Sequence, residues 1–401
     1  MALARDPLST LGRLAVLAVA LAGIFLPAAQ AGAPMAPQKK PESFDQLAKQ
    51  AEDAQHQGDS KLAVSFYLKA LEIRPNWALG WRNVGMLLAD LHDYPRAAEA
   101  LRHLVSADPK SGEGWALLGL TEYELGHYDD AYRDLEHGRT LGVGNADLEH
   151  VAAFHSALIL IQKSEFDRSY RILLRVAEAG VNDPDLVMAF GLVALRLPMK
   201  PEQVDPSEVN LVGQVGQIEF QGVNAASSRT MEAYQKLLAE LPRTPRLHYA
   251  YGNFLLSAGH FDDGIVEMQK ETELSPQDPM PPLQIALADL RIGQAPAALP
   301  YAQKAVQLAP KLFAAHYALG WALYHLGEND KAIPELEEVV KLAPDSFQGH
   351  YALSVAYAKA GRKADAARER AAYAKLKQAE PAPSGTPAAR GNAGLATSSR
   401  Q

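Results

Sequence analysis

The sequence contains no cysteine. This excludes disulfide bonds, thiolate metal sites and a cysteine nucleophile, and it excludes a lipid-modified cysteine behind an export signal. A folded core must therefore be held together by packing alone. With 48% hydrophobic and 21% charged residues, the chain has enough apolar surface to form such a core.

An excess of positive charge is also missing. Lys and Arg total 39 against 47 Asp and Glu, which gives a net charge of -8. Nucleic-acid binding requires a basic surface, so no nucleic-acid partner is expected. The sequence contains no HExxH zinc motif, no GxSxG nucleophile motif and no P-loop. We therefore expect a protein that is not an enzyme and that holds no cofactor and no metal.

A long apolar run occurs only near the N-terminus. Arg5 and Arg13 accompany an apolar stretch over 14–26, and Ala29 and Ala31 supply the small residues that signal peptidase reads. This run is too short to span about 30 Å of hydrocarbon comfortably. The sequence predicts a cleaved signal peptide over 1–31, with a retained anchor as the alternative. We expect an exported bacterial protein, periplasmic or secreted, without stable membrane insertion after cleavage.

A period of 34 residues is the dominant internal pattern. Four series of residues follow this step or a multiple of it, each in two blocks. They are prolines (75, 109; 242, 276, 310, 344), small residues (85, 119; 252, 286, 320, 354), alanines (63, 97, 131; 298, 332, 366) and glycines (58, 126; 259, 293, 327, 361).

Two antiparallel helices per period explain these series. Small residues in mid-helix let the partner helix approach closer than the usual axis spacing of about 8–10 Å. The glycine series ends each first helix in a left-handed cap, and the proline series stops each second helix. One such pair cannot bury its apolar face alone, so successive pairs must stack into a superhelix.

This pattern resembles the tetratricopeptide repeat family. The segments that begin at Trp81 and Trp115 carry its Trp, Leu-Gly, Tyr, Ala and Pro positions in register. The resemblance implies an all-α fold, an α-solenoid of stacked antiparallel helix pairs that binds other proteins. Full repeats are predicted at 44–77, 78–111, 112–145, 150–183, 211–244, 245–278, 279–312, 313–346 and 347–380.

These repeats predict two arrays, 44–183 with about four repeats and 211–380 with about five. Between them, 184–210 is predicted as a truncated repeat and an irregular connection, because prolines at 198, 201 and 206 prevent a second helix directly after the first. Ile218 and Thr230 occupy small-residue positions, so wider helix packing is expected there. The residues 32–43 are predicted as a flexible leader and 381–401 as a disordered tail.

Three histidines occupy equivalent positions in the repeats: His248, His316 and His350. Metal ligands lie about 2 Å from one ion, whereas stacked helices are about 8–10 Å apart. A shared metal site is therefore not expected. We predict that each histidine instead takes the place of the large residue that packs the two helices of its repeat.

Aromatic residues mark a candidate binding groove on the first helices of the second array. Tyr317, Trp321 and Tyr324 follow the spacing i, i+4 and i+7, which places them on one helix face. Aromatic residues with a polar tip are good anchors for a peptide. Further candidates for the same face lie in neighbouring repeats: Tyr249, Asn253, Arg291 and Tyr351.

The favoured function is a non-catalytic scaffold that binds a partner peptide or protein along the concave groove. A structural spacer in the cell envelope without a single ligand is an alternative, since the rings could simply pack against the next repeat. A second alternative is a carbohydrate-binding or enzymatic site formed by 197–210 against the groove. Solvent exposure of the three rings of 317–324 distinguishes the groove from the spacer.

Overall fold

The computed structural model describes residues 42–379, which form helices and no strands. The predicted signal peptide, nearly all of the predicted leader and the predicted tail lie outside the described residues. No described helix has both the length and the apolar character needed to cross a membrane. The all-α prediction for the repeats is confirmed.

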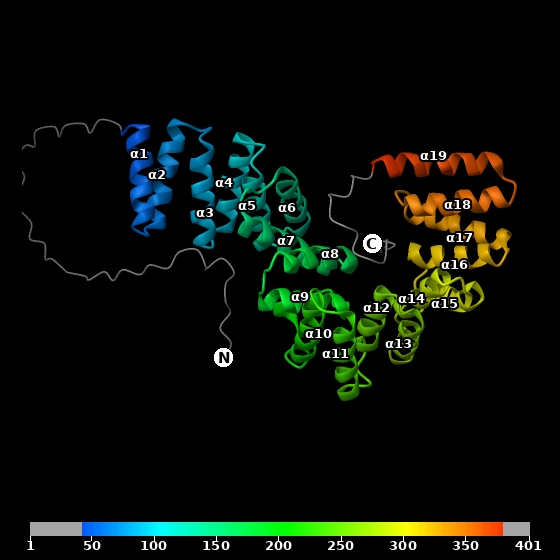
Figure 1. Cartoon of the computed structure of the whole chain (residues 1–401). Helices are drawn as coiled ribbons and strands as arrows, with labels where there is room; N and C mark the ends of the chain where they lie inside the picture. The colour runs from blue at the N-terminus through cyan, green and yellow to red at the C-terminus, as the bar shows by residue number, and fades with distance from the viewer. Residues whose placement is uncertain (1–41, 380–401) are drawn as a thin grey trace, which may run out of the picture. The chain divides into compact units, whose positions relative to one another are not determined.

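The chain divides into two compact units between Ser156 and Ala157, inside helix α7. In each unit, successive helices run side by side in an antiparallel stack (Figure 1). Unit 1 contains α1 (Phe44–His56), α2 (Ser60–Ile73), α3 (Ala78–Asp90), α4 (Tyr94–Ala107), α5 (Gly112–Glu124), α6 (Tyr128–Leu141) and the first part of α7 (Ala146–Gln162). Unit 2 contains the rest of α7, α8 (Phe166–Glu178), α9 (Pro184–Ala194), the 3-10 turn η1 (Pro201–Gln203), α10 (Val209–Gly222), α11 (Ser227–Glu240), α12 (Leu247–Ala258), α13 (Phe261–Leu274), α14 (Met280–Arg291), α15 (Ala295–Leu308), α16 (Phe313–His325), α17 (Asn329–Leu342), α18 (Phe347–Lys359) and α19 (Lys363–Ala379).

Helix ends fall where the repeat pattern predicts them. The six turn glycines of the series all have positive φ, between 78° and 89°, which is the left-handed conformation that ends a first helix. Each second helix that precedes a proline of the series ends two residues before it; α15, for example, ends at Leu308 before Pro310. The local chemistry of the turns therefore sets the lengths of the helices.

Close helix crossings occur at the small-residue positions. A Cβ added at Gly320 would lie 2.6 Å from Leu336, which is sixteen residues later on the second helix of the same repeat. Gly85 meets Leu101 in the same way, and Gly119 meets Leu135. Each glycine thus receives a buried leucine, which explains why no side chain is present at this position.

A helix pair that the repeat period does not predict joins the segment 184–210 to the start of the repeat predicted at 211–244. α9 packs closely against α10, whereas the contact of α10 with α11 is looser. At the crossing, a Cβ on Gly191 would lie 2.0 Å from the carbonyl oxygen of Val212, and a Cβ on Gly216 would lie 2.0 Å from that of Val187. The first helix predicted at 184 therefore finds its partner after η1, and α10 belongs with α9 rather than with α11.

A polar clamp recurs four residues before five of the six small residues, all except Ala286, which Pro282 precedes. In unit 1 it is a tryptophan: the indole N–H of Trp81 donates to the carbonyl of Pro75 at 2.7 Å, and Trp115 does the same to Pro109 at 3.0 Å. The clamp ties the start of the first helix to the end of the preceding repeat. In unit 2 the same position holds the three histidines that the sequence analysis identified.

Each of these histidines bridges the two helices of its repeat and the preceding proline. The Nε2 atoms of His248, His316 and His350 lie 3.0, 3.0 and 3.1 Å from the carbonyl oxygens of Pro242, Pro310 and Pro344. Their Nδ1 atoms lie 2.5, 2.6 and 2.7 Å from the carboxylates of Glu267, Glu335 and Glu369 on the second helices. All three rings are buried. The prediction that they pack the helices of a repeat is confirmed, and the close contact of each Nδ1 atom with a glutamate carboxylate is an addition.

First helices of neighbouring repeats lie closer to one another than second helices do. Within unit 2, α14 contacts α16, and α16 contacts α18, whereas no comparable approach joins α15 to α17 or α17 to α19. A stack whose first helices converge curves toward them, so α14, α16 and α18 line the inner side of unit 2.

Candidate functional site

A connected group of aromatic rings lies on α16 and α18. Trp321 is its centre: the ring centroids of Tyr317, Tyr324 and Tyr351 lie 6.1, 5.2 and 6.5 Å from its own. His325 stacks on the same indole at 5.3 Å, with an angle of 23° between the planes. The rings at i, i+4 and i+7 on α16 thus meet a ring from the next first helix.

The group is neither fully buried nor fully exposed. Tyr317, Trp321 and Tyr324 are partly buried and pack against the core of unit 2, whereas Tyr351 is 49% exposed. The rings therefore pack against the next repeat, as the spacer alternative requires, and also present surface to solvent. We call Tyr317, Trp321, Tyr324 and Tyr351 the aromatic surface.

Two polar groups of the aromatic surface, the Tyr317 phenol and the Trp321 indole N–H, are not fully hydrogen-bonded. Burial raises the pKa of the Tyr317 phenol, and the adjacent Trp321 indole N–H partly offsets this effect. The indole nitrogen is itself buried and has no hydrogen bond of normal geometry to any described residue. A buried N–H without an acceptor costs about 1–3 kcal/mol, so an acceptor brought to this position by a small movement of the rings is favoured.

Two further residues extend the aromatic surface: Tyr373 on the last helix, which the sequence did not predict, and Lys359 at the end of α18, which was expected toward the edge of this face. Tyr373 on α19 lies 5.6 Å from Tyr351 and 6.2 Å from Phe347, measured between ring centroids. Lys359 holds its ammonium 4.4 Å from the centre of the Tyr324 ring. An aromatic residue in a helix made largely of alanine and charged residues was the available signal for Tyr373.

Tyr249 does not belong to the aromatic surface. It was expected on the groove, but its side chain is only 4% exposed and lies under the guanidinium of Arg196, 5.5 Å from the ring centre. Arg196 also covers the ring of Phe166 at 4.7 Å. Because Arg196 comes from the segment after α9, a contact distant in sequence buries the ring.

Asn253 and Arg291 lie on α12 and α14, in the repeats before the aromatic surface. Asn253 is partly buried. Arg291 is exposed, and its guanidinium lies 5.3 Å from the ring centre of Phe261 on α13. Neither residue contributes to the group of rings, and both stay predicted contacts of a ligand long enough to reach α12 and α14.

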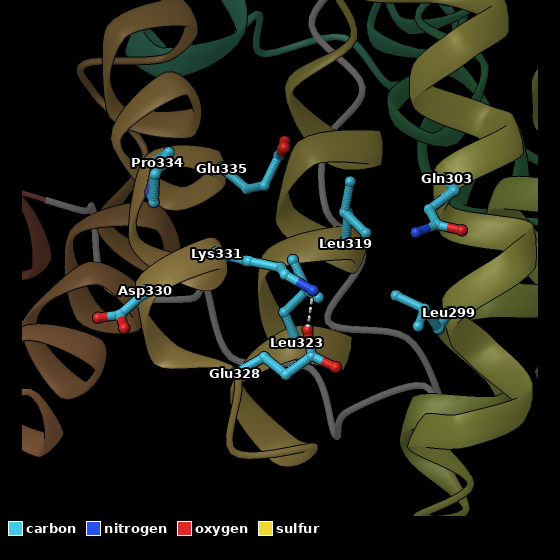
Figure 2. Close-up of a pocket in the computed structure, with 9 residues that line it drawn as sticks. All are labelled: Leu299, Gln303, Leu319, Leu323, Glu328, Asp330, Lys331, Pro334 and Glu335. Atoms are coloured by element: carbon cyan, nitrogen blue, oxygen red, sulfur yellow. Dashed lines mark ion pairs between the residues drawn. The ribbon is translucent and has the colours of Figure 1, made fainter.

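A hollow of about 460 Å³ lies on another side of the same repeats, between α15 and α17 (Figure 2). Leu299, Leu319 and Leu323 form its apolar lining. Three of its four charged side chains are engaged internally, because Lys331 pairs with Glu328 at 2.6 Å and Glu335 is held by His316. The hollow therefore offers apolar contact but few polar groups that could orient a ligand.

Comparisons with known proteins agree with the repeat. A family model described as tetratricopeptide repeat matches residues 85–136, 283–347 and 326–383, and a second model of the same description matches 54–76. No curated protein matches the chain.

Several solved structures are similar over part of the chain. "MamA 41-end from Desulfovibrio magneticus RS-1" has 20% sequence identity and a TM-score of 0.39, over 42% of this chain and 93% of that chain. "Crystal structure of YrrB: a TPR protein with an unusual peptide-binding site" has 18% identity and a TM-score of 0.36, over 52% and 93%. Because these identities are below 25% and the TM-scores are below 0.5, no partner and no binding residue is transferred from either structure.

Proposed function

Because the chain is a tetratricopeptide repeat protein, we propose that it is a non-catalytic scaffold that binds a segment of a partner protein along the inner side of unit 2. The observation that carries this proposal is the aromatic surface, a set of touching rings from two neighbouring first helices that keeps solvent exposure at Tyr351. Rings with polar tips bury much area on binding and lose little rotamer entropy. The signal peptide predicted from the sequence would place this partner in the cell envelope or outside the cell.

An extended segment of the partner fits this surface better than a patch on the partner's folded surface does. The rings run along α16 and across to α18, so a bound segment would cross successive repeats and contact one ring after another. The buried indole N–H of Trp321 lies beside the Tyr317 hydroxyl without a hydrogen bond of normal geometry, and it would meet a backbone carbonyl of the segment once the rings adjust. Such a donor aids orientation because a buried N–H gains most from an acceptor.

We expect the double substitution Tyr324→Ala and Tyr351→Ala to weaken peptide binding about tenfold or more, since each ring supplies about 1–3 kcal/mol when buried by a ligand. Peptides would be selected from a random displayed library on the wild-type protein, and their affinities measured by fluorescence polarisation. Tyr301→Ala is the matched control, because Tyr301 lies on the second helix α15 and bonds to Gln269 at 3.0 Å. Equal affinity of the selected peptides for wild type and the double variant would refute the proposed site.

A further inference from the structure

The last helix pair differs in charge from the rest of the protein. Residues 347–379 contain seven Lys and Arg against two Asp and Glu, a net charge of +5, while the whole chain carries -8. The seven cations are Lys359, Arg362, Lys363, Arg368, Arg370, Lys375 and Lys377. This basic pair carries two rings, Tyr351 and Tyr373, at the end of the aromatic surface.

Both acids of the pair are occupied within the repeat. Asp365 accepts hydrogen bonds from Arg362 and Arg368 at 2.7 and 2.8 Å. Glu369 accepts one from Arg368 at 3.0 Å and pairs with the buried His350 at 2.7 Å. Neither carboxylate is therefore available to neutralise the cations that lie beside the rings.

Two of the remaining cations lie against the rings themselves. The Lys359 ammonium lies over Tyr324 and donates to the carbonyl of that residue at 3.3 Å. Lys377 donates to the Tyr373 hydroxyl at 3.0 Å, with its nitrogen 5.4 Å from the ring centre. Since an ammonium has three N–H donors, Lys359 keeps donors for a ligand. Arg370 is exposed and lies three residues before Tyr373, which places it on the same face of α19.

We propose that the partner segment recognised at the aromatic surface is anionic, with Asp or Glu side chains set beside its apolar residues. This inference rests on the proposed function and adds the chemistry of the partner. Apolar side chains of the segment contact the rings while its carboxylates meet Lys359, Arg370 and Lys377 at the rim. Charge complementarity of this kind accelerates encounter and rejects basic sequences in a protein whose remaining surface is acidic.

The test uses two synthetic peptides of equal length in which Leu and Phe alternate with Glu in one and with Lys in the other. Affinity is measured by fluorescence polarisation at low and high salt. We expect the Glu peptide to bind about tenfold or more tightly than the Lys peptide, and the difference to shrink as salt screens the charges. The double substitution Arg370→Glu and Lys377→Glu should abolish this preference.

A matched control reverses two charges elsewhere on unit 2. Lys236 and Arg243 are exposed, one on α11 and one just after it, so Lys236→Glu with Arg243→Glu makes the same change in net charge. This control should keep the preference for the Glu peptide. Loss of the preference in both double variants would show that net charge alone governs binding, and the inference would be wrong.

The remaining outcomes separate the inference from the function on which it rests. If both peptides bind equally and Tyr324→Ala with Tyr351→Ala weakens both, the rings bind a partner and the anionic partner is refuted. If neither peptide binds, or the ring substitutions change nothing, the proposed function fails as well. A single-stranded oligonucleotide or phosphatidylserine vesicles that bind more tightly than the Glu peptide, and only with Arg370 and Lys377 present, would overturn the inference in favour of that ligand.

Discussion

Gly216→Ala should destabilise unit 2 by about 1–3 kcal/mol or more, the usual cost of overpacking. The added Cβ would lie 2.0 Å from the carbonyl oxygen of Val187 and 3.0 Å from the amide nitrogen of Gly191. Both are backbone atoms on α9, so a change of side-chain rotamer cannot relieve the clash. The two helices must separate, and the contact that joins them loosens along its length.

Gly213→Ala, three residues earlier on the same helix, is the matched control. A Cβ at Gly213 meets only the sulfur of Met188, at the ordinary contact distance of 3.7 Å. Alanine is a better helix former than glycine by about 1 kcal/mol, so this variant should be as stable as wild type or more stable. The pair of variants therefore isolates the helix crossing from the general effect of replacing a glycine.

Thermal and urea unfolding, monitored by circular dichroism, would measure the difference in stability between the two variants. Amide hydrogen exchange would show which helices are destabilised, because stacked repeats open locally. Amides of α9 and α10 should exchange faster in Gly216→Ala, while those of α16 to α19 should change little. If both variants unfolded at the same denaturant concentration, the close crossing of α9 with α10 would be wrong.

The reason the repeats could be predicted is that their signals are local. A glycine such as Gly327 ends its helix by its own backbone conformation, and Pro310 stops the preceding one without help from distant residues. The leucine received by Gly320 lies in the same repeat. Every such rule acts within one period, so the period itself reveals the fold.

The features that the sequence did not predict depend on contacts between repeats. Gly191 takes the small-residue position of the truncated repeat that begins at 184, but its partner Gly216 lies outside the 34-residue step, on a helix that follows the η1 segment. Tyr249 has the sequence environment of its counterpart Tyr317, but Arg196 covers it. Tyr373 joins the rings because α19 ends the stack beside α18. Spacing places a residue on a helix face, whereas a neighbour from another repeat decides its exposure.

The sequence predicted only part of the chemistry of the histidine clamps. Burial was predicted from the repeat position, but the glutamates lie nineteen residues further along, on the second helices. With Nε2 donating to a proline carbonyl and Nδ1 facing a carboxylate, both ring nitrogens must carry hydrogen for each contact to be a hydrogen bond. At His248 and His316 the clamp therefore favours the imidazolium form.

Unit 2 should consequently lose stability as the pH rises above the ordinary histidine pKa of about 6.5 and through the raised pKa values of the folded state. The hydrogen bonds with Glu267 and Glu335 raise the pKa values of His248 and His316 above their ordinary value, although burial opposes this. Below about pH 6.5 both histidines are protonated in the folded and the unfolded chain, so the clamps contribute fully. Once the pH passes the raised values of the folded state, each ring loses a donor and the contribution disappears.

We expect the double substitution His248→Gln and His316→Gln to flatten this pH dependence, because glutamine does not titrate in this range. The free energy of unfolding of the wild type should fall across the interval by about 1–3 kcal/mol more than that of the variant, the worth of hydrogen bonds to a charged group. Unfolding in urea at closely spaced pH values measures the difference. His325→Gln is the control, since His325 is exposed. NMR titration of the imidazole signals tests the same claim without any substitution. His248 and His316 must deprotonate above the ordinary histidine pKa of about 6.5, and titration of both at that ordinary value would disprove the charged clamps.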